Sequence, residues 1–179
     1  VQRNIDPKEW ERIQVAYWFA KEVHRTQSRN SGERYFNHCR RSAHNVLVYS
    51  DRRHDADVAI AGLCHDTVED CFVPEEVIRL LLGKHVAKSV ETLSKAIPVF
   101  EKATGSILHK EKKALDEYYR GIYDADAWVA SVKLADRLDN LSDMQSSSWN
   151  AARRQRYIEE TEKYIVPLCE RDKGLGFEL

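Results

Sequence analysis

The sequence lacks any apolar run long enough to cross a membrane. None of its hydrophobic stretches approaches the ~18–20 residues that a bilayer span requires, and its N-terminal segment has no signal-peptide core. Neither sign of charge dominates, because 28 basic residues face 29 acidic ones. Such a balance argues against general adhesion to nucleic acids or membranes. We therefore expect a cytoplasmic protein that binds neither.

Glycine, proline and cysteine are also scarce. Seven glycines and four prolines among 179 residues provide few turn signals, which favours long helices over many short strands. The cysteines at positions 39, 64, 71 and 169 include no pair spaced by two residues. A domain of this size buries enough surface to fold without disulfide bonds. We predict an all-α chain with reduced thiols.

Apolar residues recur at three- and four-residue steps through most of the chain. The first helix is expected to begin after an Asp6 cap, with Pro7 at its first position. The segment 58–64 is apolar on nearly every face, which is typical of a helix at the centre of a bundle. The predicted helices cover residues 7–25, 35–49, 55–64, 74–83, 86–93, 111–122, 127–144 and 153–171, with loops at 26–33 and 97–109.

These helices are expected to form one domain that covers residues 1–179. The sequence contains no convincing strand pair, no internal repeat and no low-complexity linker. We place Trp18, Trp128 and Trp149 in the core rather than at an interface.

Ionisable residues directly follow the most apolar helix. In the segment His65–Asp70, a continued helix would place His65 one turn from Glu69 and Asp66 one turn from Asp70. Its three carboxylates would then face the negative end of the helix dipole, and their burial without partners would cost further free energy. A bound cation would replace this repulsion with coordination.

Asp136 is a second polar interruption. An apolar helical repeat leads up to it, so its carboxylate falls on or beside the buried stripe. Lys133 and Asn140 occupy neighbouring positions on the same helix. His38, near the start of the second helix, is a further candidate ligand.

Together, His38, His65, Asp66 and Asp136 would supply two imidazoles and two carboxylates to one divalent ion. Mixed nitrogen and oxygen ligands suit Mn, Fe or Zn better than Ca or Mg. A single buried His or Asp is more often a core residue whose hydrogen bonds are satisfied within the protein. The prediction of a metal site therefore depends on the four residues occurring together. We expect the other histidines to be surface or structural residues: His24, His44, His54, His85 and His109.

These motifs resemble the signatures of a known family. The pattern in His65–Asp70 (HDTVED) and the run Lys133–Asn140 (KLADRLDN) are similar to those of RelA/SpoT-type (p)ppGpp hydrolases, members of the HD phosphohydrolase superfamily. The segments 27–38 and 160–168 resemble that family's nucleotide-binding loop and its closing helix. The similarity covers about residues 10–170.

The resemblance implies an HD-domain helical bundle with one Mn²⁺ per chain, held by His38, His65, Asp66 and Asp136. Another divalent ion is an alternative. In the family's mechanism, metal-activated water attacks the phosphorus of the 3′-pyrophosphate of guanosine tetra- or pentaphosphate. The products are pyrophosphate and GDP or GTP.

The resemblance also implies roles for residues around the metal. Glu69 and Asp70 would position the water and handle protons as the catalytic pair. Arg29 would contact the guanine nucleotide, and Asn140 would hold its sugar-phosphate. The candidate substrate-binding residues are Arg29, Asn30, Lys133 and Asn140.

Charge along the chain supports a phosphorylated small-molecule substrate. Between Lys21 and His54, eight basic residues outnumber three acidic ones, which fits a polyphosphorylated ligand. The chain departs from the family's pattern at Asn30, Arg34, Cys39 and Asp139, and these departures loosen the assignment of the nucleotide.

Two alternative functions therefore stay open. One is an HD-type phosphatase acting on another phosphorylated nucleotide, such as NADPH. The other is a catalytically silent HD domain that binds a nucleotide or a partner protein, although the presence of both Glu69 and Asp70 argues against it. Because only a short tail follows Arg171, we expect a stand-alone small alarmone hydrolase without a synthetase domain.

Overall fold

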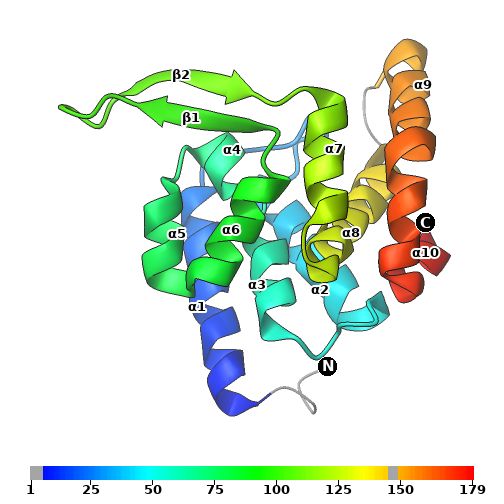
Figure 1. The fold of residues 1–179 in the computed structure, drawn as a ribbon, viewed down its shortest axis with the longest axis horizontal. Helices are drawn as coiled ribbons and strands as arrows, with labels where there is room; N and C mark the ends of the chain where they lie inside the picture. The colour runs from blue at the N-terminus through cyan, green and yellow to red at the C-terminus, as the bar shows by residue number, and fades with distance from the viewer. Residues whose placement is uncertain (1–5, 145–148) are drawn as a thin grey trace.

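The computed structural model of the chain describes residues 6–144 and 149–179, and most of them are helical (Figure 1). Helix α1 begins where Asp6 accepts a hydrogen bond from the backbone N–H of Lys8 at 2.8 Å, with Pro7 at the first helical position. This cap satisfies a backbone donor that no helical carbonyl reaches. The elements are α1 (Pro7–Val23), α2 (Tyr35–Tyr49), α3 (Ala56–Cys64), α4 (Thr67–Cys71), α5 (Glu75–Leu82), α6 (Lys84–Leu93), β1 (Ala96–Phe100), β2 (Ile107–Lys112), α7 (Leu115–Asp124), α8 (Ala127–Met144), α9 (Ala151–Glu160), the π-helical turn η2 (Thr161–Ile165), the 3₁₀ segment η3 (Val166–Arg171) and α10 (Lys173–Glu178).

Helix α3 lies in the middle of the molecule. Helices α1, α2, α6 and α8 pack around it, and every α3 residue except Asp57 is buried (Figure 1). A helix surrounded in this way needs apolar side chains on all faces. The prediction of a central helix in a bundle is therefore confirmed.

Gly62 allows α2 and α3 to pack closely. A Cβ atom at this position would meet the Cα of Ala43 at 3.0 Å, so a larger residue would push the two helices apart. The carbonyl oxygen of Gly62 also accepts a hydrogen bond from Nδ1 of His65 at 2.9 Å. The close helix contact therefore helps to orient this imidazole ring.

The predicted loop at 97–109, and the absence of a strand pair, were wrong. Strands β1 and β2 form an antiparallel hairpin, with Ala96 opposite Lys112, that projects from the helical body (Figure 1). Ile107 and Leu108 of β2 are 45% and 59% exposed, so this strand has no buried apolar face. The sequence of β2, ILHKEK, also lacks the alternation of apolar and polar residues that identifies a half-buried strand.

The predicted helix at 153–171 is not continuous. Its α-helical hydrogen bonding stops at Glu160, after which the chain passes through η2 and η3. Pro167 contributes to this change because it has no backbone N–H with which to continue an α-helix. The short helix α10 follows, beyond the last predicted helix.

Trp18 does not lie in the core, contrary to the prediction. It is 63% exposed, whereas Trp128 and Trp149 are partly buried. Helix α1 buries only one stripe of its surface, and Trp18 lies outside that stripe. Its ring packs against Tyr17 and Lys21, and it lines a cavity between α1 and the start of α2.

The cysteines and the helix lengths agree with the predictions made from the composition. The four cysteines form no disulfide bonds. Within residues 6–144 and 149–179, every helix is too short or too polar to cross a bilayer.

Glu160 anchors α9 to the helical body. Its carboxylate pairs with Arg137 at 2.7 Å and with Lys95 at 3.0 Å, and it accepts a hydrogen bond from the Tyr119 hydroxyl. Burial would raise the pKa of Glu160, but these three partners lower it to about 2. The ionised form of Glu160 therefore stabilises the folded state.

We expect Glu160→Gln to lower the free energy of unfolding at pH 7 by ~2–3 kcal/mol, because the folded-state pKa lies below the unfolded value. This stabilisation is present above pH 4.5, the ordinary pKa of a glutamate, and is lost as the pH falls towards 2. The difference between wild type and variant in urea unfolding should therefore shrink on acidification. The exposed neighbour Glu159 provides the control, Glu159→Gln, and equal stability of Glu160→Gln and wild type at pH 7 would contradict the assignment.

Candidate metal centre and active site

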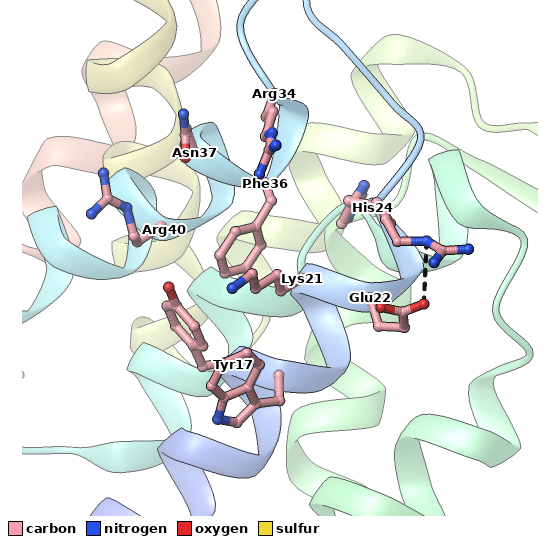
Figure 2. Close-up of a pocket in the computed structure, with 10 residues that line it drawn as sticks. Tyr17, Lys21, Glu22, His24, Arg34, Phe36, Asn37 and Arg40 are labelled. Carbon is pink, nitrogen blue, oxygen red and sulfur yellow. Dashed lines mark ion pairs between the residues drawn. The ribbon is translucent and has the colours of Figure 1, made fainter.

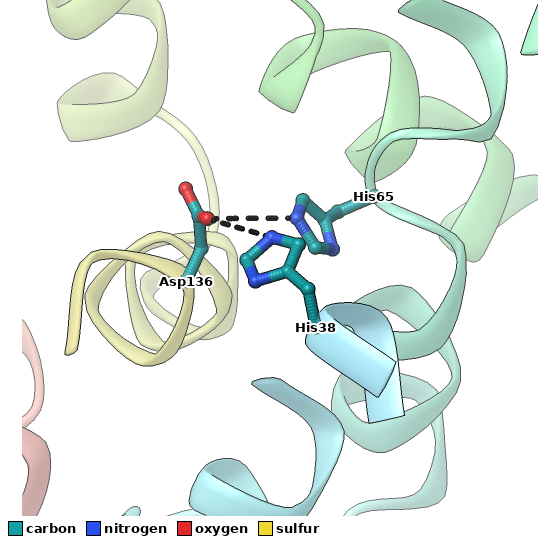
Figure 3. Close-up of side chains that lie close together, drawn as sticks. All are labelled: His38, His65 and Asp136. Carbon is teal, nitrogen blue, oxygen red and sulfur yellow. Dashed lines mark ion pairs between the residues drawn. The ribbon is translucent and has the colours of Figure 1, made fainter. Parts of the chain in front are cut away.

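Three segments far apart in the sequence bring His38, His65 and Asp136 together (Figure 3). His38 lies on α2, His65 directly follows α3, and Asp136 lies on α8. All three residues are buried, and one nitrogen or oxygen atom from each lies within 4.8 Å of the other two.

Asp66 adds a fourth ligand-type atom to this cluster. Its Oδ2 lies 3.0 Å from Nε2 of His65 and 3.6 Å from Nε2 of His38. Oδ1 of Asp136 lies 3.2 Å from Nε2 of His38 and 3.6 Å from Nε2 of His65. Ligand bonds of about 2.1 Å place neighbouring ligand atoms roughly 3.0–3.4 Å apart around one ion. The spacing of the four groups thus fits a shared metal.

Both imidazole rings present Nε2 to the centre because Nδ1 has another partner. Nδ1 of His38 lies 2.7 Å from Oδ2 of Asp139, and Nδ1 of His65 donates to the carbonyl of Gly62. Carboxylates and carbonyls commonly orient metal-binding histidines in this way. Nε2 of His65 is buried and forms no hydrogen bond among the described residues, although Oδ2 of Asp66 lies 3.0 Å away, so this nitrogen is available to bind a metal ion.

The surrounding carboxylates favour a positive charge at the cluster. Burial alone would lower the pKa of His38, but its contacts with Asp136, Asp139 and Asp66 raise that pKa to about 9. Lys133 donates to Oδ2 of Asp136 at 2.7 Å, on the side away from the two rings. The donor set and its charge therefore suit a divalent metal ion.

The segment after α3 differs from the expected continuous helix. Helix α3 ends before His65, and the short helix α4 begins after Asp66. Glu69 and Asp70 consequently lie in the first turn of α4, so the predicted repulsion from a helix C-terminus was wrong. The backbone N–H of Asp70 donates to the carbonyl of Asp66 at 2.8 Å, which preserves the predicted one-turn spacing.

Glu69 and Asp70 face the same cavity as the ligand cluster. Oε2 of Glu69 accepts a hydrogen bond from the backbone N–H of Lys95 at 2.7 Å. The Tyr35 hydroxyl lies between two carboxylates, 2.7 Å from Oδ2 of Asp66 and 2.8 Å from Oδ2 of Asp70. Burial raises the pKa of both Glu69 and Asp70, so each takes up a proton more readily than an exposed carboxyl group.

The cavity has a volume of about 170 Å³, and its cations are Lys95 and Lys133. None of the basic residues between Lys21 and His54 lines it. The lining residues are Tyr35, His38, His65, Asp66, Glu69, Asp70, Leu93, Lys95, Tyr118, Val132, Lys133, Asp136 and Asn140.

The four candidate substrate-binding residues occupy different positions. Lys133 and Asn140 line the cavity, whereas Arg29 and Asn30 do not. The side chain of Arg29 is 10% exposed, and it binds Asp139 at 3.0 Å and Asn140 at 2.6 Å. Asn30 is exposed in the loop before α2. Their roles in substrate binding stay predictions.

Sequence reasoning missed three residues that shape this site. Tyr35 bridges two carboxylates, Lys95 holds Glu69 through its backbone, and Asp139 orients His38. The available signals were weak. Tyr35 appeared only as part of the loop motif, and Asp139 only as a departure from the family's pattern.

Comparison with known proteins supports what the geometry suggests. Residues 16–174 match the HD domain family. The chain belongs to that family. This HD-domain chain is 36% identical over 168 residues to the guanosine-3′,5′-bis(diphosphate) 3′-pyrophosphohydrolase of Aquifex aeolicus (strain VF5), covering 92% of the chain and 22% of that protein.

The HD-domain chain is also 30% identical over 174 residues to the bifunctional (p)ppGpp synthase/hydrolase SpoT of Escherichia coli (strain K12). That match covers 96% of the chain and 23% of SpoT. The chain therefore spans less than a quarter of the length of these curated relatives. The resemblance to RelA/SpoT-type proteins is confirmed within this region.

A solved structure shares the fold of the HD-domain chain. It comes from work titled "A metazoan ortholog of SpoT hydrolyzes ppGpp and plays a role in starvation responses", and the TM-score is 0.76 at 24% identity. The match covers 94% of this chain and 91% of the other. The predicted all-α HD fold is therefore confirmed, with the small hairpin as an addition.

Proposed function

We propose that this chain hydrolyses guanosine tetra- or pentaphosphate at the 3′ position, giving pyrophosphate and GDP or GTP. Water supplies the oxygen of the new bond to phosphorus, the bond from phosphorus to the 3′ oxygen breaks, and that oxygen takes up a proton. The convergence of two imidazoles and two carboxylates beside a Glu-Asp pair carries the proposal. The 36% identity to a 3′-pyrophosphohydrolase over 92% of the chain supports the substrate.

We assign one divalent ion, Mn²⁺, to His38, His65, Asp66 and Asp136. Their mixed nitrogen and oxygen donors suit Mn²⁺ better than Ca²⁺. Such an ion, when bound, polarises a phosphoryl oxygen and lowers the pKa of water. The contribution of the protein is orientation, because the partners on Nδ1 of each ring hold the imidazoles in one tautomer.

We assign to Glu69 the role of general base, which accepts the proton from the attacking water. The backbone N–H of Lys95 holds Oε2 of Glu69 in place, which leaves Oε1 for the water. Asp70, positioned by the Tyr35 hydroxyl, orients the same water. The raised pKa of each carboxyl group brings its protonation equilibrium closer to neutral pH, as acid–base catalysis requires.

The size of the cavity supports binding of the pyrophosphate end of the substrate. Its volume of about 170 Å³ is well below the roughly 300–1,000 Å³ of sites that enclose whole drug-sized ligands. Lys95 and Lys133 line this position, where each also pairs with a carboxylate, and we assign to both a contact with the phosphates. The nucleoside would then extend past Asn140 towards the loop that contains Arg29.

The direct test is hydrolysis of guanosine tetraphosphate by the purified protein with Mn²⁺, with products separated by anion-exchange chromatography. We expect GDP and pyrophosphate in equal amounts. NADPH and a panel of deoxynucleoside triphosphates are tested in parallel. If NADPH were the one compound hydrolysed, the proposed substrate would be wrong. If none of these compounds were hydrolysed, the result would contradict an enzymatic role.

Replacement of Asp139 tests how His38 is oriented. We expect Asp139→Asn to weaken Mn²⁺ binding by about 10–100-fold, as is typical when a partner of a metal-binding histidine is altered. Competition with a fluorescent chelator measures this affinity, and circular dichroism checks that the variant folds. The exposed Asp124 provides the control Asp124→Asn. Unchanged Mn²⁺ affinity in Asp139→Asn would show that His38 needs no such partner.

A further inference from the structure

The basic excess between Lys21 and His54 lies mainly away from the candidate active site. Arg29 and Arg41 form ion pairs with Asp139. Four others line a separate cavity of about 550 Å³ between α1 and the start of α2 (Figure 2): Lys21, Arg25, Arg34 and Arg40. We call this cavity the α1–α2 pocket, and we propose that it binds a nucleoside di- or triphosphate. This inference goes beyond the proposed hydrolysis and does not depend on it.

The α1–α2 pocket has positive charges without counterions. Among the described residues, Glu22 is the only acidic one that lines it, and Glu22 pairs with Arg25 at 3.4 Å. Lys21, Arg34 and Arg40 form no ion pair with any residue in the described ranges 6–144 and 149–179. Three uncompensated cations around one cavity favour a polyanion, and guanidinium groups match phosphate oxygens in geometry.

Aromatic side chains form the other part of the wall. Trp18 is 63% exposed, and Lys21 Nζ lies 4.4 Å from the centre of its ring. The ring of Tyr17 packs edge-on against Trp18 and against Phe36, with centroid distances of 5.6 and 4.9 Å. Packed aromatic rings next to cations suit a nucleobase that stacks while its phosphates pair with the basic groups. Inorganic phosphate alone would leave these rings unused.

The volume of the cavity also favours a small molecule. About 550 Å³ falls within the roughly 300–1,000 Å³ typical of ligand sites. Its lining residues are distinct from those of the candidate active site. His24 lies between the two sites, because it lines the pocket and stacks on Tyr35 with ring centroids 5.0 Å apart. A nucleotide bound here would therefore leave the metal cluster open to substrate.

Calorimetric titration of the full chain with ADP and with GDP tests the proposal. We expect one Trp18-dependent site, with affinity that falls as NaCl rises. Trp18→Ala and Arg40→Ala should each weaken binding at least fivefold, whereas Trp18→Phe should retain most of it and abolish quenching of tryptophan fluorescence. The matched control is Arg156→Ala, an exposed arginine on α9. His65→Ala should leave binding unchanged, which separates this site from the metal cluster.

Several results would overturn the proposal. No detectable binding of either nucleotide would remove it, and loss of binding in His65→Ala would place the probe at the metal cluster. Equal binding of inorganic pyrophosphate in wild type and Trp18→Ala would indicate a plain anion site. Tighter binding of a single-stranded oligoribonucleotide than of ADP would indicate a nucleic-acid surface, and Trp18-dependent dimerisation would indicate a self-association surface.

Discussion

His65→Ala is expected to reduce Mn²⁺-dependent hydrolysis of guanosine tetraphosphate by about 10³-fold or more, because it removes a proposed ligand of the ion that activates water. This loss of rate corresponds to ~4 kcal/mol of transition-state stabilisation. Nε2 of His65 is buried at the centre of the ligand cluster and has no hydrogen-bond partner among the described residues. Alanine leaves three of the four ligands in place, so Mn²⁺ binding should weaken as well. Steady-state kinetics and metal analysis measure the two effects.

The exposed His54 provides a matched control, His54→Ala, which should keep full activity. Added Mn²⁺ should raise the melting temperature of the wild type and of His54→Ala but not that of His65→Ala, since a ligand stabilises the state that binds it. Cooperative unfolding of His65→Ala without metal shows that the variant folds. Normal activity in a folded His65→Ala chain would refute the proposed ligand set.

Glu69→Gln is expected to lower kcat by about 10²–10⁴-fold, the usual contribution of a positioned general base. The amide is nearly the same size as the carboxylate, and its oxygen still accepts the hydrogen bond from the Lys95 backbone. It cannot accept a proton from water, however. We therefore expect Mn²⁺ affinity and melting temperature to stay close to those of the wild type.

The control for this substitution is Glu76→Gln, on the exposed face of α5, which should not change kcat. Rapid-quench measurement of a single turnover shows whether the loss lies in the chemical step. Near-normal kcat in Glu69→Gln would move the proton-accepting role to another group. Loss of Mn²⁺ together with activity would instead make Glu69 a ligand or a structural support of the metal cluster.

The helical fold was predictable because the apolar residues that recur at helical spacing in this chain are largely the residues that the structure buries. The central helix α3 is apolar on nearly every face, and the structure surrounds it with other helices. The hairpin could not be predicted in the same way, since the exposed Ile107 and Leu108 give β2 no core-facing stripe. The break after Glu160 was missed because η2 and η3 continue a helical spacing of apolar residues with a different hydrogen-bond pattern.

The candidate ligands were accessible to sequence reasoning because carboxylates and histidines interrupt apolar helices. Residues that act through distant partners were not accessible. Tyr35 reaches Asp66 across 31 positions, and Asp139 reaches His38 across 101. The basic excess after Lys21 was visible in the sequence, but only tertiary structure shows that four of its members gather at a second cavity.

Gly62 contributes both to the packing of α2 against α3 and to the orientation of His65. A methyl group there would meet Ala43 at 3.0 Å and displace α2 by a few tenths of an ångström. Gly62 also carries the carbonyl oxygen that accepts the hydrogen bond from His65 Nδ1, so the same movement would reach this imidazole ring. Substitutions at this glycine would therefore disturb helix packing and the proposed metal site together, so a loss of thermostability and a loss of activity should appear in the same variants.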